Sequence, residues 1–236
     1  MTQRAELSTD EEFRGAARSR MYRLLAGAFA FPEEPFHRAV LSGEFLSGVL
    51  EIAAGLPYAL PLAEGEALRT AVAGVPADYV EFQSEYIRLF DVGMPRPPCP
   101  LYGGLHLGSR RAVMQEVTRF YNHFGLSLGG ESRELPDHIT TELEFMHFLT
   151  FRDVTALQGG QDREPCLRAQ RDFLQRHLAR WVPKVRMQAE QQGAAPFFLG
   201  LVGLAEAFLL ADLSYVASLV GPAPPGRPPE AIRGEP

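Results

Sequence analysis

The sequence predicts an all-α, bundle-like fold of roughly eight to ten helices. Apolar residues recur with the 3.6-residue period of amphipathic helices, whereas the alternation typical of strands is scarce. Prolines and glycines interrupt these stripes at short intervals, which separates many short segments. A chain of 236 residues with 46% hydrophobic content suits one globular domain. We therefore expect a helical domain over residues 1–220 and a disordered, proline-rich tail over 221–236.

The N-terminal half shows a series of helical stripes separated by prolines. The first helix should begin near Asp10 and end before Pro32. Pro35 can open the second helix, because proline is tolerated in a first turn. Further helices are expected over residues 43–56, 64–73 and 79–90.

A loop rich in proline, MPRPPCPLYGG, runs from Met94 to Gly104 and cannot be helix interior or central strand. A helical stripe follows over 114–124, with Gly125 as its C-terminal stop. The stripe over 139–149 is widened by several phenylalanines, which predicts a helix at the centre of the fold. Those phenylalanines are Phe145, Phe148 and Phe151. Two more long helices are expected over 164–182 and 196–220.

Composition excludes several classes of protein. The net charge of −6, without a block of lysine and arginine, argues against a nucleic-acid binder and favours neutral or cationic partners. The N-terminal MTQRAELSTDEEFRG lacks the apolar segment of a secretory signal. The most apolar stretch, 193–220, is interrupted by Pro196, Glu206 and Asp212, so it lacks the ~18 uncharged residues of a membrane span. We expect a cytoplasmic protein without stable membrane insertion.

The segment ELPDH, from Glu134 to His138, is open to several interpretations. Asp137 could cap the following helix by accepting a first-turn amide N–H, which is worth about 1 kcal/mol. A cap leaves Glu134 and His138 unexplained. Acid–base catalysis would use all three side chains, but no nucleophile motif or phosphate-binding loop accompanies them. Beside two carboxylates, the pKa of His138 is expected to rise.

A metal site is a further alternative. Glu144 and His147 form a Glu-x-x-His pair, and Glu34 and His37 form another. Two such pairs with two more inward glutamates would describe a di-iron bundle, and hence a metal-dependent enzyme. The second pair lies at a helix start, and the additional glutamates are missing from the apolar stripes.

A surface that recognises cations is the remaining interpretation. The carboxylates of Glu134 and Asp137 can bind arginine through charge-assisted hydrogen bonds. Apolar groups that could hold a peptide beside them are Tyr86, Phe90, Leu101, Tyr102 and Phe120. Tyr102 stands in the proline-rich loop, where we expect it at the surface.

The order of several motifs is similar to that of a known family. YIRLF (Tyr86–Phe90) precedes the proline-rich loop with PLY (Pro100–Tyr102), then RFYNHFGL (Arg119–Leu126), then ELPDHITTELEFM from Glu134. From about Met21 to about Tyr215 the chain resembles the TorD/DmsD/NarJ family of redox-enzyme maturation chaperones. The CPLYGG loop with FYNHFGL looks most like the branch that serves type II dimethyl sulfoxide reductase-like enzymes.

The resemblance implies a cytosolic, all-helical chaperone without enzymatic turnover and without a cofactor, as a monomer or homodimer. Such a protein binds the twin-arginine signal peptide, or the apo-form, of the catalytic subunit of a molybdenum enzyme until molybdopterin is inserted. The resemblance places peptide contacts at Glu134, Pro136, Asp137, His138, Tyr86, Leu89, Pro100 and Tyr102. Loop tryptophans of some relatives are absent here, and the only tryptophan is Trp181.

Overall fold

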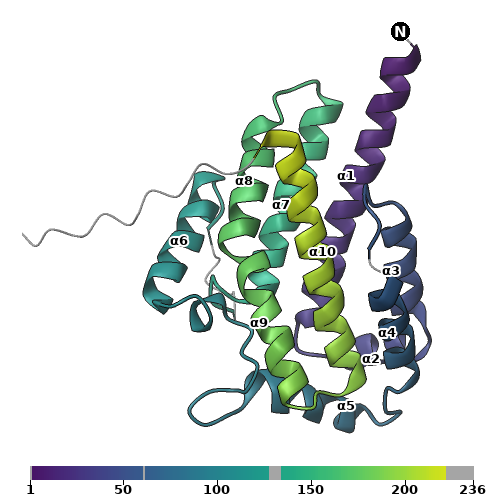
Figure 1. Ribbon diagram of the computed structural model, residues 1–236, viewed down its shortest axis with the longest axis vertical. Coiled ribbons are helices and arrows are strands. Elements are labelled where there is room, and N and C mark those ends of the chain that lie inside the picture. The colour runs from purple at the N-terminus through teal and green to yellow at the C-terminus, as the bar shows by residue number, and fades with distance from the viewer. Residues whose placement is uncertain (1, 61, 128–133, 222–236) are drawn as a thin grey trace, which may run out of the picture.

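Residues 2–60, 62–127 and 134–221 are described by the computed structural model, and they form helices packed side by side (Figure 1). No β-strand occurs in these ranges, so the predicted all-α class is confirmed. The tail predicted to be disordered lies, from residue 222 on, outside the described residues.

The described ranges contain ten α-helices and two shorter turns. In chain order the α-helices are α1 (Thr2–Phe29), α2 (Glu34–Leu41), α3 (Glu44–Ala54), α4 (Leu62–Ala73), α5 (Tyr79–Tyr86), α6 (Arg110–His123), α7 (Ile139–Gln158), α8 (Glu164–Arg176), α9 (Leu178–Gln191) and α10 (Pro196–Val220). A π-helical turn, η1 (Ile87–Asp91), continues α5, and a 3-10 turn, η2 (Gly103–Leu105), precedes α6.

Local chemistry explains several of the helix ends. The Asp78 carboxylate accepts the amide N–H of Glu81 at 2.9 Å and caps α5. Proline stands in the first turn of α2, as predicted from Pro35. Gly125 follows α6 with φ +74°, a left-handed conformation that glycine adopts without strain. The first helix begins at Thr2 and not near Asp10.

The helix predicted over 164–182 is two helices, α8 and α9. The chain breaks at His177, whose backbone has φ −124° and ψ −100°. The buried imidazole of His177 packs against the rings of Phe120 and Phe173, which fixes the break. Pro183 lies inside α9 and does not end it. The break went unpredicted because His177 is neither a glycine nor a proline.

The predicted central position of α7 is confirmed. Helix α7 lies against α1 and α8 (Figure 1). Its side chains Ile139, Leu143, Met146 and Leu149 are fully buried. Phe151, which the sequence placed on the same apolar face, is 61% exposed, so that part of the prediction is wrong.

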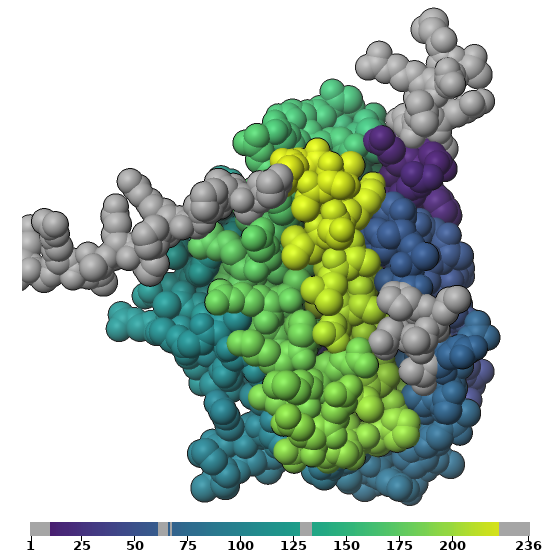
Figure 2. All heavy atoms as spheres, in the orientation of Figure 1, coloured from purple at the N-terminus to yellow at the C-terminus, as the bar shows by residue number. Residues whose placement is uncertain are grey.

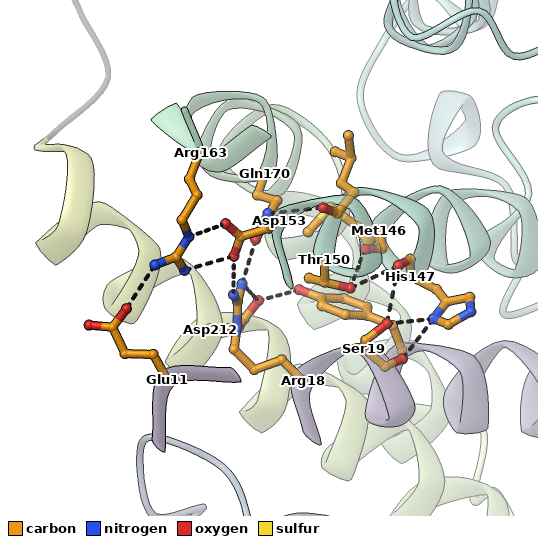
Figure 3. Close-up of polar contacts among 12 residues, drawn as sticks. Glu11, Arg18, Ser19, Met146, His147, Thr150, Asp153, Arg163, Gln170 and Asp212 are labelled. Carbon is orange, nitrogen blue, oxygen red and sulfur yellow. Dashed lines mark hydrogen bonds and ion pairs between the residues drawn. The ribbon is translucent and has the colours of Figure 1, made fainter. Parts of the chain in front are cut away.

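The core also contains a buried ion pair between α1 and α10. The guanidinium Nε of Arg18 lies 2.5 Å from Oδ1 of Asp212, and its Nη2 donates to Gln170 at 2.7 Å (Figure 3). The hydroxyls of Tyr22 and Tyr58 donate to the same carboxylate at 2.5 and 2.7 Å. Burial by itself lowers the pKa of Arg18, but attraction to Asp212 outweighs it and raises the pKa. Arg18 therefore stays charged, and its bonds to Asp212 and Gln170 fix how α1, α8 and α10 pack.

A second buried carboxylate extends this network to α7. Asp153 accepts from Nε of Arg163 at 2.7 Å, and Arg163 in turn binds Glu11 at 2.8 Å (Figure 3). Nη1 of Arg18 lies 4.0 Å from Asp153. The N-terminal helix is thus tied to the start of α8 by charged groups.

Helix α10 alone among the described helices is long and apolar enough to cross a membrane by length and composition. Of its most apolar window, 61% is buried inside the protein. Figure 2 shows α10 lying between α8 and α9 on one side and α3 and α4 on the other. The buried Asp212 stands on this helix, so α10 serves as a core helix of the fold.

Replacing Arg18 should destabilise the fold. In an Arg18→Met variant the free energy of unfolding should fall by about 3–5 kcal/mol, because Asp212 is left as an unpaired buried carboxylate. Urea unfolding followed by circular dichroism measures it. The control is Arg20→Met, which removes an exposed ion pair with Glu51 and should change the same quantity by less than about 1 kcal/mol. Equal effects of the two substitutions would contradict this account.

Candidate functional site

The proline-rich loop and the ELPDH segment are joined by backbone hydrogen bonds. The amide of Gly103 donates to the carbonyl oxygen of Asp137 at 2.8 Å, and the amide of Ile139 donates to that of Leu101 at 2.9 Å. The two segments lie far apart in the sequence, yet they form one short antiparallel unit. The side chains of one segment therefore have fixed positions relative to the side chains of the other segment.

Asp137 holds this unit together from inside. Its side chain is 0% exposed, and Oδ2 accepts the amide N–H of Gly104 at 3.0 Å. A Cβ atom at Gly104 would lie 2.8 Å from that oxygen and 2.9 Å from Cα of Arg110, so only glycine fits. The predicted cap on α7 is wrong: His138 is the N-cap, with Nδ1 accepting the amide N–H of Thr140 at 3.4 Å.

The buried side chains of Glu142 and Trp181 pack against the proline-rich loop from inside the protein. Nε1 of Trp181 donates to Oε2 of the fully buried Glu142 at 3.1 Å. A Cβ atom at Gly103 would lie 3.0 Å from both side chains. Burial raises the pKa of Glu142 well above its usual range, and the charge of Asp137 adds to the effect. Sequence reasoning missed this pair because nothing in the local pattern connects α7 with α9.

Tyr102 and Glu134 form the accessible side of the unit, and the buried ring of His138 packs against Tyr102. Tyr102 and His138 pair in an isolated antiparallel bridge, with their ring centroids 4.8 Å apart. The Tyr102 hydroxyl donates to Oε2 of Glu134 at 3.0 Å, and Nε2 of His138 lies 3.9 Å from the same atom. Burial raises the pKa of Tyr102 to about 12, and the Glu134 carboxylate adds to this shift.

The expected rise in the pKa of His138 is wrong. Its ring is buried, and burial lowers the pKa although Glu134 and Asp137 both act to raise it. A second bond orients the ring, since Nδ1 lies 2.7 Å from the hydroxyl of Thr140. The imidazole therefore serves as a neutral cap and spacer rather than as a competitor for the carboxylates.

A hollow of about 590 Å³ lies against this accessible side, and we call it the loop pocket. Its aromatic lining comes from Phe31, Tyr86, Phe90 and Tyr102, its carboxylates are Asp91 and Glu134, and its cations are Arg96 and Arg110. A smaller hollow of about 340 Å³ shares Phe31, Glu134 and His138 with it and adds Glu144 and His147. The smaller hollow also contains the cation Arg23, and Glu134 stands between the two hollows.

The structure brings together five of the predicted contact residues. Tyr86, Phe90, Tyr102, Glu134 and His138 all line the loop pocket. Phe31 lines it too and was missed, because an apolar residue before a proline gives no sign of its exposure.

The other predicted contact residues lie elsewhere. Leu89, Pro100, Leu101 and Asp137 are buried and line neither of the two hollows, so the structure places the predicted groove wall at Leu101 inside the protein. Pro136 uses its carbonyl oxygen to accept the Tyr121 hydroxyl at 2.8 Å. Phe120 lines a different hollow, between α6 and α8.

The two Glu-x-x-His pairs do not form a metal site. Glu34 binds Arg38 at the surface, and Nε2 of His37 lies 2.8 Å from the carbonyl oxygen of Pro76. Nδ1 of His147 lies 2.8 Å from the hydroxyl of Ser19. Across the described ranges, no group of three or more His, Cys, Asp and Glu residues suits a metal ion. The di-iron alternative therefore has no support from this geometry.

Comparison with known proteins gives consistent matches. Residues 58–186, which contain both segments of the site, match the family model described as nitrate reductase delta subunit. The perchlorate reductase assembly chaperone protein of Dechloromonas aromatica (strain RCB) is 36% identical over 84% of this chain and 88% of its own length. The dimethyl sulfide dehydrogenase assembly chaperone protein of Rhodovulum sulfidophilum is 30% identical over 89% and 85%. The selenate reductase assembly chaperone protein of Thauera selenatis is 41% identical over 48% and 60%.

Because Arg110 and Asp137 approach Gly104 closely, one added methyl group at this position should destabilise the protein. Gly104→Ala should lower the free energy of unfolding by about 1–3 kcal/mol, because the added Cβ meets backbone and a buried carboxylate. The control is Gly48→Ala inside α3, where the Cβ would meet only Leu24 at 3.8 Å, and it should raise stability by about 0.5–1 kcal/mol. Thermal or urea unfolding of both variants measures this. A neutral Gly104→Ala variant would refute the close contact.

The lowered pKa of His138 predicts how stability depends on pH. A histidine with a depressed folded pKa contributes stability above its unfolded pKa, near 6.5, and loses it as the pH falls. His138→Asn keeps a capping side chain that does not titrate. Between pH 7 and pH 5.5 the wild type should therefore lose up to about 1 kcal/mol more stability than this variant. The pKa values of His106 and His177 are also lowered, but both histidines are present in the wild type and in the variant. Their contribution to the pH dependence of stability therefore cancels in the comparison. Identical pH slopes would show that His138 is not a buried neutral cap.

Proposed function

Because the chain belongs to the nitrate reductase delta subunit family, we propose that it assembles a molybdenum oxidoreductase by binding the catalytic subunit before export. The relatives reported above are named as assembly chaperones and not as catalysts, so binding is its function. The finer proposal concerns what is bound: the twin-arginine signal peptide of that subunit. We further propose that the chain acts in the cytoplasm, where insertion of molybdopterin precedes export.

The position of Glu134 carries this proposal. Its side chain is 42% exposed, and its carboxylate is shared by the loop pocket and the smaller hollow. Glu144 adds a second exposed carboxylate to the smaller hollow. Paired guanidinium groups bind carboxylates through charge-assisted, often bidentate hydrogen bonds. We therefore place the two arginines of the peptide in the smaller hollow.

The apolar run that follows the arginines fits the aromatic side of the site. Phe31 lines both hollows, so a chain leaving the smaller one crosses this ring into the loop pocket. At the edge of that pocket the loop exposes Met94, which is 98% accessible, between the lining residues Gly93 and Pro95. Unbranched methionine side chains adapt to varied apolar ligands.

Arg110 indicates how a guanidinium is accommodated here. Its cationic group lies 5.7 Å from the centre of the Tyr102 ring, a cation–π contact. The same ring binds Glu134 through its hydroxyl. Arg110 therefore contacts the ring in the loop pocket, and the arginines of the client are placed at the carboxylates of the smaller hollow.

Binding should depend on the charge of Glu134. The probe is a synthetic peptide with two adjacent arginines followed by an apolar run of about 12 residues. Glu134→Gln should weaken its binding by about tenfold to a hundredfold, because a charge-assisted hydrogen bond of about 1.5–3 kcal/mol is lost. The salt dependence of the dissociation constant should decrease in parallel. Isothermal titration calorimetry at two salt concentrations measures both.

The matched control for this experiment is Glu164→Gln on α8. It makes the same change of charge at an exposed carboxylate, which is paired with Arg168 away from both hollows. This variant should bind the peptide as the wild type does. If the two variants bind equally, Glu134 does not hold the arginines and the peptide site is wrong.

A further inference from the structure

A hollow of about 1050 Å³ on the outer face of α6 is lined by three arginines and by no carboxylate. The arginines are Arg110, Arg111 and Arg119, and apolar surface comes from Met114 and Leu135. We call this hollow the α6 groove. Each of the other four hollows described for this chain is lined by two carboxylates, so the α6 groove differs from them in charge.

The geometry of α6 spreads these charges along the helix. Arg111 and Arg119 stand on one row of the exposed face, about 12 Å apart along the helix axis. The opposite face buries Val113, Val117 and Tyr121 against the core. In Figure 1, α6 lies at the outer flank of the bundle. The arginine row therefore faces outward and has no core function.

The positive charge of this row is not neutralised within the part of the chain that the structure describes. The carboxylate of α6, Glu116, binds Arg176 of α8 instead. Arg111 and Arg119 make no ion pair or hydrogen bond with other described residues. Arg110 and Arg111 also stand in the first turn of α6, where the helix dipole disfavours cations and no acidic residue is present. Folding alone does not explain this placement.

We propose that the α6 groove binds an acidic, amphipathic segment of the client catalytic subunit, separate from its twin-arginine peptide. The inference rests on the proposed function. The backbone positions of Arg111 and Arg119 are separated by about 12 Å along the helix, a distance that a peptide segment spans while it offers a carboxylate to each guanidinium group. Met114 and Leu135 receive the apolar side chains of the same segment.

The groove is also continuous with the proposed peptide site. Arg110 lines both the α6 groove and the loop pocket. Leu135, at the wall of the groove, follows Glu134 directly. One client chain can thus place its arginines at Glu134 and an acidic stretch along α6. Opposite charges on the two surfaces fix the direction in which the client lies.

The test uses two fluorescent peptides of about 18 residues with helical apolar spacing. One carries glutamates eight positions apart, to match Arg111 and Arg119, and the other carries glutamines there. Fluorescence anisotropy should show that the wild type prefers the glutamate peptide by about tenfold or more. Arg111→Glu/Arg119→Glu should abolish this preference, and Arg111→Gln/Arg119→Gln should abolish it without adding repulsion.

The control is Arg20→Glu/Arg38→Glu, which makes the same change of net charge at two exposed arginines of α1 and α2. It should keep the preference. If it loses the preference as the groove variant does, or if inorganic pyrophosphate displaces the glutamate peptide at equal concentration, the proposal is overturned. The twin-arginine peptide reports separately on the proposed function, because its binding should depend on Glu134 and be unchanged in both arginine variants.

Discussion

The hydrogen bonds between Asp137 and the Gly103–Gly104 backbone are the interaction on which the candidate site depends. They join the proline-rich loop, through its 3-10 turn η2, to the start of the central helix α7. Without them Tyr102 would have no fixed position relative to Glu134 and His138. The carboxylate is fully buried, so its role is to build the surface and not to contact a client.

The other polar groups of the site divide in the same way, according to whether they are buried or exposed. Buried polar groups such as Glu142 and Trp181 fix the shape, and exposed groups such as Glu134 and Met94 remain available for binding. The same logic applies to the bundle, where the ion pair of Arg18 aligns helices distant in sequence. A chaperone that must hold a client without chemistry needs a rigid frame and an adaptable surface. Both features meet where the proline-rich loop pairs with the ELPDH segment.

Much of the fold could be predicted because helical periodicity is a local signal, and the positions of α2, α3, α4 and α10 follow from it. The geometry of the site was harder to predict from the sequence. Asp137 and His138 are adjacent and both can cap a helix, so only the tertiary bond to Gly104 decides which one does. Leu101 and Met94 are both apolar loop residues, and their opposite exposure depends on contacts with distant helices. Pairing between segments far apart in the chain leaves no local pattern.

Hydrogen exchange at the Gly103 and Gly104 amides, measured by nuclear magnetic resonance, tests the central claim most directly. If the two segments form one unit, both amides should exchange as slowly as the amides of α7, because they open only when that helix does. An Asp137→Asn variant should then lose protection at Gly104 first. Fast exchange at these amides in the wild type, with α7 still protected, would contradict the account.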